Sequence, residues 1–226
     1  MGQPAKLTCH QYADRIRTSA GLKAHARALA GKHGQEYLDD WMAVHMAETR
    51  WAKQMLKHRQ FTCMDTETTS TDRVAEMTEI AVIDGRGAPL CETLIKPYGP
   101  IKVTARGITG ITEDDIKGAP RLADVYDKIQ SALLARPIML IYNAEFDVRI
   151  LKQSTFQAGL PEFELPQVED LMLRFARWCG VWNHRQDDYV WHRLEGGHRA
   201  LGDCRSMIAL MEKMARLEPT PGWSPE

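Results

Sequence analysis

The segment Phe61-Thr-Cys-Met-Asp-Thr-Glu-Thr-Thr69 is rich in apolar and β-branched residues and predicts a β-strand. Side chains of a strand alternate between its two faces, so Phe61, Cys63, Asp65 and Glu67 share one face. Two carboxylates therefore extend a stripe that begins with apolar side chains. An ionised carboxylate is costly to bury without a partner. A shared site for divalent cations would remove that cost and indicates phosphate-ester chemistry.

A second acidic cluster, Asn143-Ala-Glu-Phe-Asp147, follows the short apolar run Pro137–Tyr142, which predicts a buried strand. We expect a helix to start near Glu145. On this helix Asp147 aligns with the inward stripe, whose members are Ile150, Leu151 and Ala158. Glu145 should instead point outward to solvent.

A third cluster, His198-Arg-Ala-Leu-Gly-Asp203, opens a predicted helix over 200–216. Asp203 leads the apolar stripe of this helix, which consists of Met207, Leu210, Met211 and Met214. At about 100° of rotation per residue, a continuous helix would point His198 and Asp203 well apart. We therefore place His198 in the loop after Gly196-Gly197, where its side chain can reach the same site.

Taken together, the three clusters resemble the motifs of the DEDDh exonucleases, the DnaQ-like group of the ribonuclease H-like superfamily. Asp65-Thr-Glu67 resembles the first motif, Tyr142–Asp147 the second and His198–Asp203 the third, in its histidine form. Gly107-Ile-Thr-Gly-Ile-Thr-Glu113 resembles a loop of that family. The resemblance covers roughly residues 60–216 and implies an α/β fold, a ribonuclease H-like mixed sheet flanked by helices.

The resemblance also implies a site that holds two Mg²⁺ or Mn²⁺ ions. Asp65 would lie between the ions, Glu67 and Asp203 would bind the ion on the nucleophile side, and Asp147 would bind the other. His198 would act as general base. The residues expected to contact the terminal nucleotide are Thr66, Thr68, Ile108 and Asn143.

Other histidines remain open as the base. His184 and His192 lie in the loop before the third motif, and we prefer His198 because only it has the family's spacing to Asp203.

The function that we expect is 3′→5′ exonuclease action on DNA, preferably single-stranded, which releases nucleoside 5′-monophosphates. The same chemistry on RNA or short oligonucleotides, and a binding module without turnover, are the alternatives. Choosing between DNA and RNA requires knowing how the site treats a 2′-hydroxyl group, which the sequence does not show.

Periodicity and turn residues predict the order of the elements. Helices are expected at 8–30, 35–59, 121–135, 146–158, 168–179 and 200–216, and strands near 60–68, 78–84, 89–96 and 138–143. Asp84–Gly87 should form a hairpin turn. We expect a helical N-terminal extension (1–59), an exonuclease domain (60–217) and a disordered tail (218–226).

Charge is unevenly distributed along the 226 residues. Residues 1–60 contain ten Lys or Arg and five Asp or Glu, although the net charge of the whole chain is −1. A basic N-terminal part could help to grip nucleic acid, or it could be an ordinary solvated helical face. These helices could equally dock a polymerase or a second copy of the chain.

The five cysteines show neither paired nor zinc-binding spacing, which favours reduced thiols in the cytoplasm. No apolar run is long enough for a membrane span, and we expect no membrane association.

The segment 177–197 interleaves aromatic and basic residues, among them Trp178, Trp182, His184, Tyr189 and Trp191. Such a mixture suits stacking on single-stranded nucleic acid. The same rings could instead close the core under a loop, and the sequence favours neither interpretation.

Overall fold

The computed structural model describes residues 7–16 and 18–216, which form two compact units. The helical unit comprises the described chain up to His58, Leu171–Glu195 and the chain from Ala209 onward. The sheet unit comprises Arg59–Asp170 and Gly196–Ile208. The predicted disordered tail lies outside the described residues, and the predicted domain boundaries stay a prediction.

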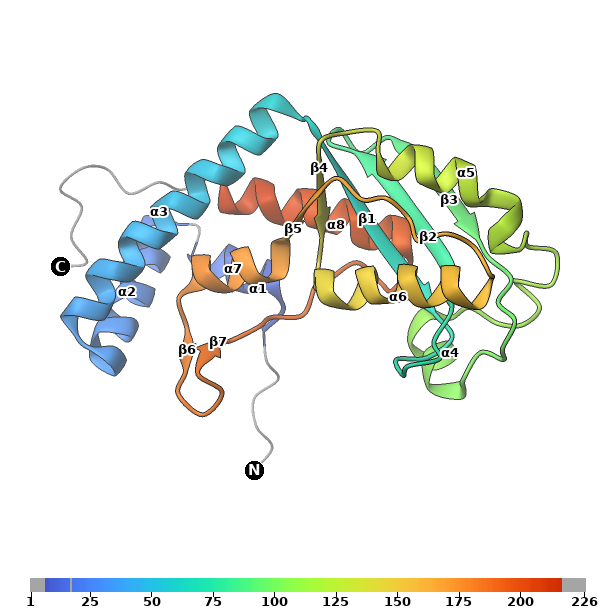
Figure 1. Ribbon diagram of the computed structural model, residues 1–226. Helices are drawn as coiled ribbons and strands as arrows, with labels where there is room; N and C mark the ends of the chain where they lie inside the picture. Colours follow the sequence, from blue (N-terminus) through green and yellow to red (C-terminus); the bar gives the residue numbers. More distant parts are fainter. Residues whose placement is uncertain (1–6, 17, 217–226) are drawn as a thin grey trace. The chain divides into compact units, whose positions relative to one another are not determined.

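A five-stranded mixed sheet is the centre of the sheet unit (Figure 1). Its order is β3-β2-β1-β4-β5, with antiparallel pairs β3-β2 and β2-β1 and parallel pairs β1-β4 and β4-β5. The strands are β1 (Phe61–Thr68), β2 (Met77–Asp84), β3 (Pro89–Leu94), β4 (Ile138–Ile141) and β5 (Gln167–Asp170). The predicted mixed sheet with flanking helices is confirmed.

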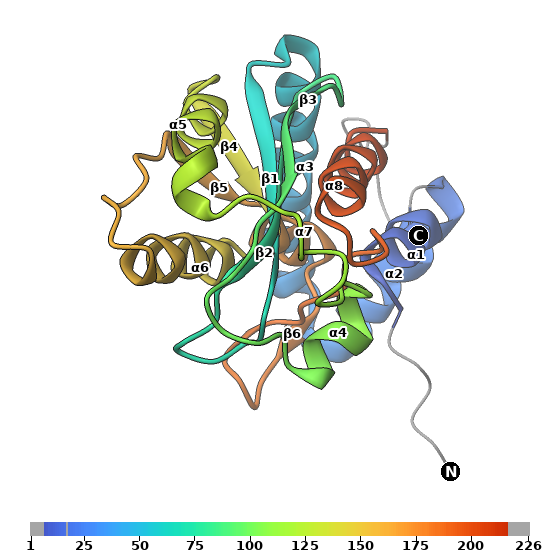
Figure 2. The ribbon, with the colours of Figure 1, turned by 90° about the vertical axis from the view of Figure 1, so that its right-hand side faces the viewer.

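Helices cover both faces of this sheet. Figure 2 shows α5 (Leu122–Leu133) and α6 (Ala144–Gln157) on one side of it. The first part of α8 (Ala200–Met214) lies on the other side, where the Sγ atom of Cys204 is 3.5 Å from the carbonyl oxygens of Cys63 and Ala81.

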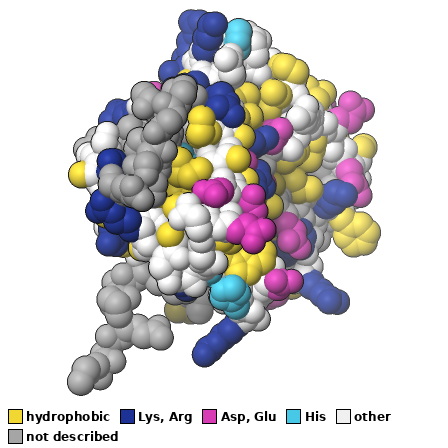
Figure 3. All heavy atoms as spheres, turned by 90° about the vertical axis from the view of Figure 1, so that its left-hand side faces the viewer, with side chains coloured by type: hydrophobic (Ala, Val, Ile, Leu, Met, Phe, Trp, Pro, Cys, Tyr) yellow, Lys and Arg dark blue, Asp and Glu magenta, His cyan; other side chains and the backbone are white. Residues whose placement is uncertain are grey.

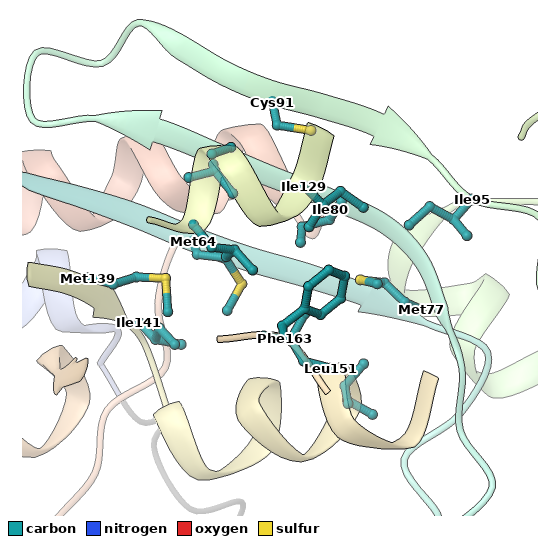
Figure 4. Close-up of a cluster of buried hydrophobic side chains, with 14 of the residues drawn as sticks. Met64, Met77, Ile80, Cys91, Ile95, Ile129, Met139, Ile141, Leu151 and Phe163 are labelled. Carbon is teal, nitrogen blue, oxygen red and sulfur yellow. The ribbon is translucent and has the colours of Figure 1, made fainter. Parts of the chain in front are cut away.

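The core between the sheet and α5 and α6 contains Met64, Ile80, Ile129, Leu151 and Phe163, all buried (Figure 4). Met64 therefore faces this core, whereas its neighbours Cys63 and Asp65 face α8, as the alternation of strand side chains requires.

Two predictions about this unit were wrong in detail. The Gly-Ile-Thr segment, expected as a loop, begins inside a short helix, α4 (Val103–Thr109), which ends at Gly110 with φ +71°. Glycine and β-branched residues have low helix propensity, so the sequence did not predict this helix. Its Ala105 packs with Ile101, Ile111 and Ile116 in a small buried cluster. The helix expected from residue 168 begins only at Leu171, because Gln167–Asp170 pair with β4 as strand β5.

The helical unit contains α1 (Cys9–Ile16), α2 (Ser19–His33), α3 (Gln35–His58) and α7 (Leu171–Cys179), with a short hairpin of β6 (Trp182–Asn183) and β7 (Asp188–Tyr189). The single helix expected over 8–30 is therefore two helices. Thr18 caps the second of them, because its Oγ1 accepts a hydrogen bond from the N–H of Gly21 at 3.0 Å.

Packing of α3 against α7 forms the centre of the helical unit. The indole of Trp178 is fully buried and donates to Thr49 Oγ1 at 2.9 Å. Trp41 is also buried, and its indole N–H donates to the carbonyl oxygen of Trp178 at 3.1 Å. No helix of the described chain has the length and apolar character that crossing a bilayer requires.

Candidate active site

Three of the predicted acidic residues converge. One carboxylate oxygen from each of Asp65, Glu67 and Asp203 lies within 4.8 Å of the others. Asp65 and Glu67 come from the same face of β1, and Asp203 comes from the first turn of α8. The pairing of β1 with β2 shifts register directly after Glu67, an irregularity of the kind that re-aims side chains near functional sites.

Asp147 is buried at the start of α6, on the inward face as predicted. Its Oδ1 accepts two hydrogen bonds from Thr66, one from the backbone N–H at 3.0 Å and one from the hydroxyl at 2.7 Å. The first and second motifs are thus joined directly. The predicted outward direction of Glu145 is confirmed, because that residue is exposed.

The start of α6 is held by two features. Asn143 adopts a left-handed conformation with φ +68°, which turns the chain sharply out of β4. The N–H of Ala144 donates to Asp170 Oδ2 at 2.8 Å, so the last residue of β5 supplies the helix cap that the side chain of Asn143 does not provide.

The acidic groups raise one another's pKa values. Burial raises the pKa of Asp65 well above its usual range, and the charges of Asp147, Asp203 and Glu67 raise it further. The pKa of Glu67 is raised to about 8, first by burial and then by Asp203 and Glu79. Burial also raises the pKa of Asp147, although the bonds from Thr66 oppose this. Crowded carboxylates that resist ionisation together are a favourable setting for a cation.

His198 lies in the loop before α8, as predicted, in a left-handed conformation with φ +54°. The competing histidines both have contacts within the helical unit. His184 Nε2 lies 3.2 Å from His33 Nδ1, and the ring of His192 lies 4.4 Å from that of Tyr12. The choice of His198 as base stays a prediction.

Glu79 is a site residue that the sequence analysis missed. It is buried in β2 directly opposite Glu67, and both its carboxylate oxygens accept from Arg199, at 2.6 to 3.2 Å. One oxygen also accepts from the N–H of Ala200 at 3.0 Å, where α8 begins. The signal in the sequence was an acid in the interior of a largely apolar strand, two residues after Met77.

Gly196 has a steric role that the sequence did not reveal. A Cβ atom added to Gly196 would lie 1.5 Å from Asp203 Oδ1 and 2.5 Å from Asp203 Cα. The loop backbone can therefore approach Asp203 this closely only because residue 196 has no side chain.

The predicted substrate-contacting residues differ in their availability. Asn143 is exposed, and Ile108 is 56% exposed on α4. Thr66 is already bound to Asp147, and the buried hydroxyl of Thr68 donates to the carbonyl oxygen of Ser70 at 2.7 Å. Their roles toward a nucleotide stay predictions.

Comparison with known proteins agrees with this geometry. The family model described as "Exonuclease" (RNase T) matches residues 62–211. An uncharacterized exonuclease of Escherichia phage 186, CP81, is 33% identical over 170 residues, which cover 68% of this chain and 87% of the phage protein. The PolC-type DNA polymerase III of Bacillus cereus is 26% identical over 205 residues, 88% of this chain but 14% of the polymerase.

A solved structure of E. coli exonuclease I with a dA16 oligonucleotide has a similar fold, with a TM-score of 0.55 and 22% identity. The match covers 69% of this chain and 40% of exonuclease I. The family model spans the strand that carries Asp65 and Glu67, the helix that carries Asp147 and the helix that carries Asp203. The chain belongs to the DEDD exonuclease family, within the ribonuclease H-like superfamily.

Proposed function

We propose that this protein is a metal-dependent 3′→5′ exonuclease that acts on DNA, preferably single-stranded. The observation that carries the proposal is the convergence within 4.8 Å of Asp65 and Glu67 from β1 with Asp203 from α8, which is distant in the sequence. Membership of an exonuclease family supports the reaction class. Relatives named as DNA polymerase III proteins support DNA as the substrate.

The donor set fits hard divalent cations. Carboxylate oxygens are the ligands that Mg²⁺ and Mn²⁺ prefer, and the pKa values of Asp65 and Glu67 are raised first by burial and then by neighbouring carboxylates. We assign one ion to Asp65, Glu67 and Asp203 and a second to Asp65 and Asp147. When bound, the two ions would stabilise charge on the attacking and leaving oxygens of the phosphodiester.

The side chains of the chain have separate tasks in this proposal. His198 accepts a proton from the attacking water, because imidazole is the side chain most often used for proton transfer at neutral pH. Thr66 fixes the orientation of Asp147 through its two hydrogen bonds. Ile108 and Asn143, both exposed, would contact the terminal nucleotide. The product would be a nucleoside 5′-monophosphate.

The test uses strands labelled at the 5′ end: single-stranded DNA, duplex DNA and RNA, each incubated with Mg²⁺, Mn²⁺ or EDTA. We expect a ladder that shortens from the 3′ end of single-stranded DNA, no ladder with EDTA, and none with the Asp65→Asn variant. Faster degradation of RNA than of DNA would indicate that RNA is the preferred substrate. Cutting of a circular single strand, or no cutting of any substrate, would contradict the proposal.

We also propose a cytoplasmic location, because all five cysteines are buried thiols. The basic N-terminal part would contact nucleic acid or a polymerase. On the face shown in Figure 3, Lys and Arg side chains form several separate groups with acidic and hydrophobic side chains between them. On this face, nucleic acid or a polymerase would therefore meet several small basic groups rather than one broad basic patch.

A further inference from the structure

A cavity of about 430 Å³ lies in the helical unit, and none of its lining residues is assigned a role in the proposed active site. Its lining comes from the end of α2, the start of α3 and the β6–β7 hairpin, which are distant in the sequence. The lining residues are Lys32, His33, Tyr37, Trp182, His184 and Tyr189. This volume lies within the range of small-molecule binding sites.

The walls of the cavity are aromatic rings. Trp182 and Tyr189 pack edge to face, with centroids 5.0 Å apart and planes at 88°. On the helical side, the rings of His33 and Tyr37 lie 4.7 Å apart at 39°. Rings from two sides of a half-open cavity provide flat π surfaces, against which a planar heteroaromatic group can stack.

The polar groups of the cavity favour an anion. Lys32 is exposed at the end of α2, and the lining includes no carboxylate from the described part of the chain. The imidazoles of His33 and His184 lie 3.2 Å apart, and the buried Nε2 atom of His33 has no hydrogen-bond partner within the described chain. Tyr37 adds no charge, because burial raises the pKa of its hydroxyl to about 12 and that hydroxyl donates to the carbonyl oxygen of Gly180 at 2.8 Å.

A flat ring next to a negative charge is the chemistry of a nucleotide. We propose that this cavity binds one nucleotide of a single-stranded nucleic acid, with its base against Trp182 and Tyr189 and its phosphate near Lys32. The inference rests on the proposed function for the identity of the strand. It assigns to the helical unit a substrate contact separate from hydrolysis.

The experiment measures binding in EDTA, so that hydrolysis does not interfere. Fluorescence anisotropy of a short 5′-fluorescein oligothymidylate gives the Kd at a fixed salt concentration. The second probe is a strand of the same length built entirely from abasic tetrahydrofuran units, which keeps the phosphates and lacks the bases. The unaltered 226-residue chain is compared with Trp182→Ala, Trp182→Phe and Trp191→Ala. Trp191 is a matched control, because it is 53% exposed in the same segment and does not line this cavity.

We expect Trp182→Ala to weaken binding of the oligothymidylate about tenfold, the loss of one stacked base. The same variant should bind the abasic strand as the unaltered protein does, Trp182→Phe should keep most of the affinity, and Trp191→Ala should change neither Kd. Lys32→Ala should weaken binding of both strands, whereas Lys128→Ala, which alters an exposed lysine of α5, should not.

Unchanged binding by Trp182→Ala, or an equal loss on both strands, would overturn the inference. The outcome is separable from that of the proposed function. If the protein hydrolyses DNA and Trp182→Ala binds both strands normally, the cavity inference is wrong and the proposed nuclease function stands. If Trp182→Ala loses base-dependent binding but the unaltered protein cuts no strand with Mg²⁺ or Mn²⁺, the cavity inference stands and the nuclease proposal is wrong.

Discussion

At the scale of single residues, the site holds several carboxylates in buried positions, where their ionisation costs folding free energy. Asp65 and Glu67 are buried, and burial together with repulsion by neighbouring carboxylates raises the pKa of both. In the absence of a cation, this repulsion opposes folding. The same residues that suit a metal site should therefore reduce the stability of the metal-free protein.

The first prediction concerns Glu67→Gln. The pKa of Glu67 is about 8 in the folded chain and near 4.5 when unperturbed, so ionising it at neutral pH costs folding free energy. In EDTA the variant should melt a few degrees higher than the unaltered protein. Addition of Mn²⁺ should raise the Tm of the unaltered protein and have much less effect on the variant. Thermal unfolding followed by circular dichroism measures both, and an equal Mn²⁺ shift in the two proteins would refute Glu67 as a ligand.

The second prediction concerns His198. Loss of a general base lowers turnover by about 10²–10⁴-fold, so His198→Ala should lose kcat to this extent and still bind Mn²⁺ in calorimetry. His58→Ala, at an exposed position at the end of α3, is the control and should keep full activity. A His198→Ala protein as active as the control would leave His184 or His192 as the base.

At the scale of elements, hydrogen bonds between a strand and a helix position the third motif. Glu79 of β2 holds Arg199 and the first N–H of α8, and Asp203 lies in the turn that follows. The backbone of Gly196 lies so near Asp203 that a Cβ atom at position 196 would be 1.5 Å from Asp203 Oδ1. The position of Asp203 therefore depends on residues that need not touch substrate.

The third prediction is that Glu79→Gln lowers both stability and kcat. The neutral amide cannot keep the charged, two-pronged bond to Arg199, and hydrogen bonds to charged groups contribute about 1.5–3 kcal/mol. Urea unfolding should show a loss near the lower end of this range, because the side chain of Arg199 is 55% exposed. A fall in kcat with little change in KM would identify a positioning role. Glu92→Gln, an exposed change on β3, should alter neither quantity.

At the scale of the whole molecule, the helical unit is assembled from separate parts of the chain. Helix α3 from the N-terminal part packs on α7, more than 100 residues later, around Trp178. Two imidazoles are enclosed there: His25 Nε2 lies 2.7 Å from the carbonyl oxygen of Cys179, and His45 Nδ1 lies 2.9 Å from that of Trp178. Burial lowers the pKa of both, to about 4 for His45.

The fourth prediction follows from that pKa. The folded protein keeps His45 neutral, whereas the unfolded chain takes up a proton as the pH falls below 6.5. The contribution of His45 to stability is thus complete above pH 6.5 and is lost as the pH falls toward 4, on the order of 3 kcal/mol in total. Urea unfolding of the unaltered protein and of His45→Gln should show a stability difference that shrinks across this window. The exposed-site control His58→Gln should show a constant difference, and a constant difference for His45→Gln would refute a neutral buried imidazole.

Sequence patterns predicted the structure correctly where it depends on residues close together in the chain. Alternation in Phe61–Thr69 predicted the shared face of Asp65 and Glu67, and helical periodicity predicted the inward position of Asp147. Local patterns failed where tertiary contacts outweigh propensity. A Thr18 cap divides a segment that was expected to be one helix, and pairing with β4 makes Gln167–Asp170 a strand.

The aromatic segment 177–197 shows the same limit. Composition alone could not separate a core ring from a surface ring, and the structure contains both, with Trp178 fully buried and Trp182 lining a cavity. Which ring is buried depends on what packs against it, and α3 comes from a distant part of the chain.

The sequence by itself determined the family, the mixed sheet and the acidic residues of the site, because spacing and periodicity are properties of neighbouring residues. Only the tertiary structure decided that Asp203 meets Asp65 and Glu67, that Glu79 and Gly196 position it, and that a cavity forms between α2, α3 and the hairpin. These contacts join residues far apart in the chain. Burial and hydrogen bonding select them among many alternatives that a linear pattern cannot distinguish.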